Sequence, residues 1–130
     1  MRIHLLMATA ALALCAGSAQ AEFSLHVLHI NDFHSRIEPI NKFDSTCTEK
    51  DAAEDGCFGG VARVKAAIDG LRDTLRAEGE NVIVLDAGDQ SQGSLMFTTY
   101  RGAAEADFMA QIGFDAMAIG NHEFDNGPEG

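Results

Sequence analysis

The sequence predicts an α/β fold in which parallel strands carry helices on the face of the sheet. Three short apolar runs of the kind found in buried strands alternate with two stretches of helical periodicity. Strand–helix–strand connections of this type are right-handed and place successive strands parallel to one another. A short polar loop follows each apolar run directly. Because the carboxyl ends of parallel strands share one edge of the sheet, we expect the three loops to meet there.

The first predicted strand covers residues 23–30 and runs into Asn31-Asp32-Phe33-His34. An apolar run that is followed directly by a polar loop is typical of a strand end. His26 and His29 lie inside the strand, and neither has a partner at a metal-ligand spacing. We expect both to be packed or edge side chains and not metal ligands.

Residues 38–60 are polar and predict a surface excursion, not a linker between domains. They contain Cys47 and Cys57, which are ten residues apart. In an exported protein such an even pair indicates a disulfide, which would contribute about 2–3 kcal/mol to stability. The alternative is two free thiols.

The first predicted helix covers residues 61–78. Apolar residues recur at spacings of three and four from Val61 to Leu75, and charged residues take the other faces. Gly79 is placed to end this helix. The aliphatic run at residues 81–85 predicts the second strand, which leads into Asp86-Ala87-Gly88-Asp89.

The second predicted helix begins at about Ser94 or Ala103 and ends at Gln111. A third strand follows at residues 114–119. This run is short and nearly uncharged, so we expect it to be buried. It leads into the loop that begins at Gly120.

Residues 1–21 have the pattern of a cleaved export signal. A short basic start precedes an almost wholly apolar stretch at residues 5–16, and Ala19-Gln20-Ala21 supplies the small residues of a signal-peptidase site. Those twelve residues are too few to span a bilayer, which needs about 20. We therefore expect a periplasmic or extracellular protein without a stable membrane anchor, with one mature domain at residues 22–130.

The charge of the chain is strongly acidic, with a formal net value of −11. Without Arg2 of the signal, eight basic residues stand against twenty acidic ones, which gives −12. This excess argues against a nucleic-acid or anionic-membrane partner, since both would need a basic face. It suits a protein that collects cations, although most of these carboxylates are expected to form a solvated surface.

Each strand-end loop contains side chains of metal-ligand type. An Asp-x-His segment offers a hard oxygen and an imidazole from alternate positions, so both can reach one ion. Carboxylates brought together without a cation would repel one another, and a divalent ion removes that conflict. The residues expected to converge are Asp32, His34, Asp89, Asn121, His122 and Asp125.

Three motifs in this order resemble the signature of the calcineurin-like metallophosphoesterases: Asp32-Phe33-His34, Gly88-Asp89 and Gly120-Asn121-His122-Glu123. The longer strings at residues 28–34, 86–93 and 120–126, and the cysteine pair just before residues 59–63, resemble the secreted 5′-nucleotidase family within that superfamily. The resemblance covers essentially the whole mature chain. It implies the N-terminal βαβαβ part of a calcineurin-like metallophosphatase sandwich.

The resemblance also implies a dinuclear metal site. Asp32 and His34 would hold the first ion, Asp89 would bridge both ions, and Asn121 would bind the second. Mixed oxygen and imidazole donors suit zinc, manganese, cobalt or iron.

Catalysis is implied for the same loop as Asn121. His122 would lie beside the scissile phosphate as the catalytic acid, and Asp125 would orient its ring. A histidine held by a carboxylate can stabilise developing charge or protonate a leaving oxygen. Glu123 is expected to be structural, packing or hydrogen-bonding the loop.

The function implied by the resemblance is that of an exported phosphohydrolase releasing phosphate from nucleoside monophosphates. A 2′,3′-cyclic phosphodiesterase, a UDP-sugar hydrolase and a thiosulfohydrolase are alternatives within the superfamily, and a catalytically inactive fragment that only binds metal is another. In the family, later histidines complete the metal shells and a separate C-terminal domain binds the nucleoside. We therefore expect residues 22–130 to be the N-terminal part of a longer protein.

Overall fold

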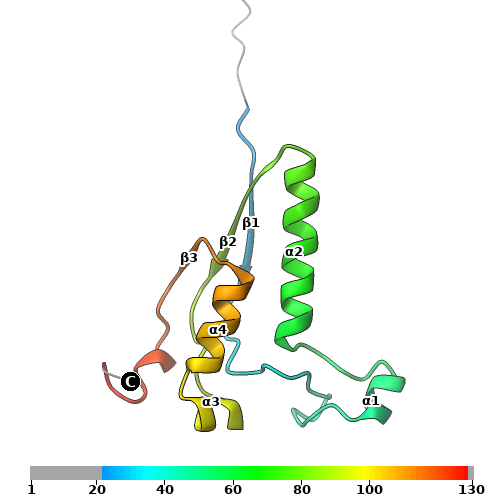
Figure 1. Ribbon diagram of the computed structural model, residues 1–130, viewed down its shortest axis with the longest axis vertical. Coiled ribbons are helices and arrows are strands. Elements are labelled where there is room, and N and C mark those ends of the chain that lie inside the picture. The colour runs from blue at the N-terminus through cyan, green and yellow to red at the C-terminus, as the bar shows by residue number, and fades with distance from the viewer. Residues whose placement is uncertain (1–21, 129–130) are drawn as a thin grey trace, which may run out of the picture.

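The computed structural model describes residues 22–128 and shows three strands with helices between them (Figure 1). The predicted export signal at residues 1–21 lies outside the described residues. The order of strands and main helices confirms the predicted α/β class. The elements are β1 (Leu25–Ile30), α1 (Glu49–Ala53), α2 (Val61–Ala77), β2 (Asn81–Asp86), α3 (Leu95–Tyr100), α4 (Ala103–Ile112), β3 (Ala116–Met117) and a 3₁₀ turn, η2 (His122–Phe124).

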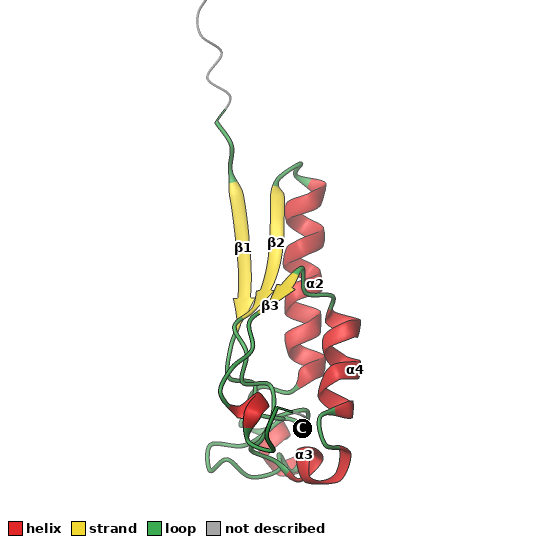
Figure 2. Cartoon of the chain, turned by 90° about the vertical axis from the view of Figure 1, so that its left-hand side faces the viewer, coloured by secondary structure: helices red, strands yellow, loops and turns green. Residues whose placement is uncertain are grey.

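The sheet has the order β1-β2-β3, and both pairings are parallel as predicted. β1 pairs with β2 from Leu25 opposite Asn81 to Ile30 opposite Asp86. The carboxyl ends of all three strands point to the same end of the molecule (Figure 2). The polar loops that follow the strands therefore begin side by side.

The helices α2 and α4 lie on the same side of the sheet (Figure 2). Their apolar residues pack with Val84, which is fully buried at the centre of β2. The α2 face that was predicted to be apolar contributes Val61 and Ile68 to this core, and α4 contributes Ile112. Burial of these side chains fixes the helices against the sheet and so fixes the strand ends.

The predicted helix starting at Ser94 or Ala103 is two helices. Ser94 caps α3 by accepting a hydrogen bond from the backbone N–H of Met96, and Ala103 begins α4. The break falls at Arg101 and Gly102, which have φ values of 53° and 88°. Left-handed residues end one helix and allow the chain to start another in a new direction.

The third strand is shorter and more exposed than expected. The prediction of a buried strand over residues 114–119 is wrong, because only Ala116 and Met117 pair with β2, and both are exposed. Ile119 is 68% exposed. β3 lies at the edge of the sheet in the described part of the chain, so an apolar composition there does not lead to burial.

The surface excursion between β1 and α2 is held by the predicted disulfide between Cys47 and Cys57, whose Cα atoms are 5.6 Å apart. Ile40 forms isolated bridges to Thr46 and Phe58 on either side of this bond. The excursion also contains α1, with a capping box at Thr48. In the described range, no helix is both long enough and apolar enough to cross a membrane.

Candidate metal centre

The loops after β1 and β2 run alongside each other beyond the ends of the strands. The Asp32 N–H donates to the Gly88 carbonyl at 3.0 Å, and the His34 N–H donates to the Asp89 carbonyl at 3.1 Å. These bonds extend the parallel pairing past the sheet. As a result, the Asp-x-His segment is fixed directly opposite the Gly-Asp segment.

The third loop approaches the second at a glycine–glycine contact. A Cβ atom on Gly88 would lie 2.5 Å from the Gly120 nitrogen, and Gly88 also has a φ of 93°. A Cβ on Gly120 would overlap the side chain of Asp89. The two backbones can come this close only because neither residue has a side chain.

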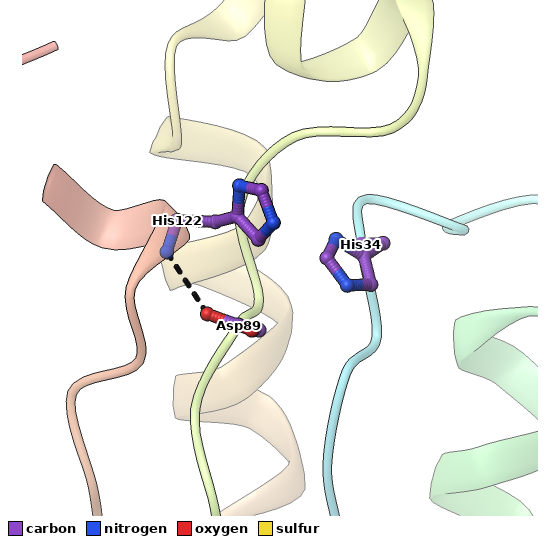
Figure 3. Close-up of side chains that lie close together, drawn as sticks. All are labelled: His34, Asp89 and His122. Atoms are coloured by element: carbon purple, nitrogen blue, oxygen red, sulfur yellow. Dashed lines mark hydrogen bonds between the residues drawn. The ribbon is translucent and has the colours of Figure 1, made fainter. Parts of the chain in front are cut away.

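Ligand-type atoms of His34, Asp89 and His122 come together at this junction, all within 4.8 Å of one another (Figure 3). Each residue comes from a different strand-end loop and is partly buried. The two imidazole rings meet edge to face, with their centroids 5.0 Å apart. The backbone N–H of His122 donates to Asp89 Oδ1 at 2.9 Å, which ties the second and third loops together (Figure 3).

Asp32 lies beside this cluster, with Oδ1 3.5 Å from His34 Nε2. The Asn31 amide donates to its other oxygen, and this bond, followed by the nearby His34, lowers the pKa of Asp32 below its ordinary value. Asn121 directly precedes His122 at the start of η2 and is exposed. Among residues 22–128, no hydrogen bond reaches the Asn121 side chain.

Asp86 is also an acidic residue of the second loop region, but it faces inward. It is 3% exposed, its Oδ1 accepts hydrogen bonds from the Gly88 N–H and the Gln90 amide, and burial raises the pKa of its carboxyl group. Asp86 is not among the side chains whose ligand-type atoms come together. The geometry therefore favours Asp89 over Asp86 as the ligand.

The side chains of His122 and Asp125 are hydrogen-bonded to each other. His122 Nδ1 and Asp125 Oδ2 are 2.7 Å apart, and this hydrogen bond raises the pKa of His122 and lowers that of Asp125. Gln92 Nε2 donates to the same Asp125 oxygen at 2.7 Å. Sequence reasoning missed Gln92, because no local pattern shows that its side chain reaches a residue in another loop.

Glu123 hydrogen-bonds loop backbone, as expected. Its carboxylate accepts four N–H groups from the second and third loops. Burial alone would raise the pKa of Glu123, but the four hydrogen bonds together lower it. The carboxylate is therefore held in its ionised form within the loop junction.

The backbone at the cluster is strained. Asp32, His34 and Asp89 have φ values of 51°, 49° and 55°, and Ser35 and Gln92 are also left-handed. Non-glycine residues in this conformation cost about 1–3 kcal/mol each and persist where the surroundings hold them. Such residues cluster at functional sites, in agreement with a centre that fixes the direction of its ligand side chains.

A cleft of about 890 Å³ adjoins the centre. It lies between residues 35–46 and 92–100 and begins at Ser35, next to His34, and at Gln92. Its lining includes the hydroxyl-bearing residues Ser94, Thr98 and Tyr100 as well as the apolar residues Ile40, Leu95 and Met96. The cluster is thus bordered by an open cleft with both polar and apolar lining residues.

The donor set fits a divalent cation. Carboxylate oxygens and imidazole nitrogens lie close together there. Among residues 22–128, no lysine or arginine forms a hydrogen bond or ion pair with His34, Asp89 or His122. Mixed donors of this type suit transition metals such as zinc, manganese, cobalt or iron. The fold and this cluster together define a candidate divalent-metal centre at the carboxyl edge of a parallel sheet.

The comparison with known proteins gives the class directly: residues 25–130 match the calcineurin-like phosphoesterase family, and the chain belongs to it. It is 48% identical over 112 residues to the human 5′-nucleotidase, covering 86% of this chain and 18% of that protein. The chain thus spans less than a fifth of that relative's length.

Two solved structures resemble the chain. The NAD nucleotidase of Haemophilus influenzae has a TM-score of 0.65 at 37% identity, covering 81% of this chain and 17% of that one. The 5′-nucleotidase precursor of Thermus thermophilus has a TM-score of 0.62 at 40% identity, covering 82% and 19%. These similarities confirm the predicted family and its 5′-nucleotidase branch.

Proposed function

We propose that residues 22–130 are the N-terminal part of the metallophosphatase domain of an exported phosphohydrolase of the 5′-nucleotidase type. The substrate class is nucleoside monophosphates, and the products are a nucleoside and phosphate. The observation that carries this proposal is the convergence of His34, Asp89 and His122 from three strand-end loops. The identity to 5′-nucleotidases across most of the chain supports the choice of substrate.

Four side chains would hold two divalent ions. Asp32 and His34 would hold the first ion, Asp89 would be shared by both ions, and Asn121 would hold the second. When bound, the ions supply a polarised water and positive charge at the phosphoryl oxygens. The hydrogen bond from the His34 N–H to the Asp89 carbonyl supports this assignment, because it holds the first two loops side by side.

His122 supplies the proton chemistry. Its Nδ1 is hydrogen-bonded to Asp125, so Nε2 is the ring nitrogen available to the substrate. In the imidazolium form, Nε2–H can donate to the oxygen that leaves with the nucleoside. Asp125, itself held by Gln92, fixes the ring direction and favours that protonated form.

Export is part of the proposal. Residues 1–21 would be removed as a signal, and the mature protein would act in the periplasm or outside the cell. The Cys47–Cys57 disulfide supports this location, because such bonds persist in oxidising compartments.

The test is an assay of the full-length protein that carries this chain, after loading with zinc, manganese, cobalt or iron. Products are identified by chromatography: adenosine and phosphate from AMP, UMP and glucose 1-phosphate from UDP-glucose, and a nucleoside monophosphate from a 2′,3′-cyclic nucleotide. We expect AMP to be the preferred substrate. Absence of phosphate release from AMP with every metal, while another substrate is hydrolysed, would overturn the nucleotidase assignment.

A further inference from the structure

Glu123 occupies the junction between the second and third site loops and accepts hydrogen bonds from both. Its Oε1 accepts the N–H groups of Gln90 at 2.7 Å and Ser91 at 3.1 Å. Its Oε2 accepts the N–H groups of Asp89 at 3.0 Å and Gly120 at 2.7 Å. One side chain thus satisfies four backbone donors that would otherwise have to find separate partners.

The connection between the loops also runs in the opposite direction. While Glu123 accepts the Asp89 N–H, the Asp89 carboxylate accepts the backbone N–H of His122 at 2.9 Å. Each loop therefore contributes one carboxylate that binds the backbone of the other. Both bonds act on Asp89, whose left-handed φ of 55° needs such support.

We propose that Glu123 is a positioning residue for the metal centre. Its carboxylate fixes the backbone of Asp89 and the turn that carries His122, so that the ligand side chains are arranged before an ion binds. A site arranged in advance loses less conformational freedom on binding, and groups that support ligands strengthen metal affinity. The inference rests on the proposed function only in taking Asp89 as a ligand.

Two substitutions separate the effect of the charge of Glu123 from the effect of its side-chain length. Glu123→Gln keeps the shape but turns one acceptor oxygen into an NH₂ group that faces two backbone donors. Glu123→Asp keeps the charge but shortens the side chain by one methylene. Glu78→Gln is a matched control. Glu78 is an exposed residue at the carboxyl end of α2, and this end of the helix lies far from the site loops.

The experiment measures Mn²⁺ binding by calorimetry to the full-length, metal-free protein and its variants. Backbone N–H exchange is followed in the same samples. We expect Glu123→Gln to weaken Mn²⁺ binding by roughly 10–100-fold. Exchange should become faster at the four donors bound by Glu123 but not in β2. Glu123→Asp should show a smaller loss, and Glu78→Gln should bind as the parent does.

Unchanged Mn²⁺ affinity in Glu123→Gln, with faster exchange at the four donors, would overturn the proposal. It would show that Glu123 holds the two loops together without affecting metal binding. If Glu123→Gln does not fold, Glu123→Asp decides: parental Mn²⁺ affinity with faster exchange rejects the positioning role, and weakened affinity supports it. Neither measurement depends on hydrolysis of a nucleotide, so failure of the proposed function would be seen separately.

Discussion

Asp125 Oδ2 lies 2.7 Å from Nδ1 of His122 and receives a second hydrogen bond from Gln92. A single carboxylate oxygen therefore connects one ring of the His34–Asp89–His122 cluster with a residue that lines the adjoining cleft. The arrangement is that of a histidine whose protonated form is favoured by an oriented anion.

The His122–Asp125 pair predicts that the free energy of unfolding of the metal-free protein depends on pH. The hydrogen bond with Asp125 raises the pKa of His122, so its stabilising effect is complete below the unfolded value of about 6.5 and is lost as the pH rises through the folded value. The pKa of Asp125 is lowered, so its contribution is present above its unfolded value and is lost as the pH falls through the folded value.

Asp125→Asn should therefore lower the pKa of His122, measured by NMR titration of the imidazole in metal-free protein. Asp73→Asn, on the exposed face of α2, serves as the control and should leave it unchanged. A His122 titration that is the same in Asp125→Asn and in the parent would show that Asp125 does not set this equilibrium.

A second prediction concerns the role of His122 itself. His122→Ala in the full-length protein should reduce kcat by about 10²–10⁴-fold while bound metal stays nearly constant, because the ring acts as an acid and not as a ligand. Metal content is measured by elemental analysis. His26→Ala is the control, since His26 pairs with Glu80 at 3.3 Å at the other end of the sheet.

The alternative role for His122 is that of a metal ligand, since one of its ring nitrogens lies within 4.8 Å of the ligand atoms of His34 and Asp89. Loss of both metal and turnover in His122→Ala would show that the imidazole binds an ion or holds the fold.

A third prediction concerns the disulfide. Replacing Cys47 and Cys57 together by serine should lower the free energy of unfolding by about 2–3 kcal/mol, because the bond restricts a short loop of the unfolded chain. Urea unfolding of the oxidised parent and of the double variant measures this difference. The reduced parent should unfold like the double variant. A reduced parent as stable as the oxidised one would contradict the prediction.

The parts of the fold that follow from local sequence were predictable. The periodicity of α2 and the aliphatic run of β2 each specify their element within a few neighbouring residues, and the alternation of elements gives a parallel sheet. The exposure of β3 was not predictable in this way. It depends on which strands flank it, and an apolar run carries no information about its neighbours.

In the site, too, some contacts follow from the sequence and others do not. Asp32, His34 and Asp89 directly follow strand ends, so topology alone brings them together. The bonds of Gln92 to Asp125 and of Glu123 to the second loop join residues more than thirty positions apart. They depend on the paths of two loops at the Gly88–Gly120 contact, which sequence patterns do not specify.

The last prediction compares the two aspartates of the second loop region. Asp89→Asn should remove more bound metal than Asp86→Asn, because Asp89 lies in the cluster whereas Asp86 is 3% exposed and bonded to Gln90. An amide in place of the Asp89 carboxylate loses a negative charge and one of the two oxygens that would contact the ions.

The Asp86 substitution is expected to change the stability of the fold. Burial raises the pKa of Asp86, so a neutral amide of the same size relieves part of the cost of a charge in the core. Asp86→Asn should therefore alter thermal stability more than metal content. Both variants are compared by equilibrium dialysis with Mn²⁺ and by thermal unfolding. Equal metal loss in the two variants would show that Asp89 is not the bridging ligand.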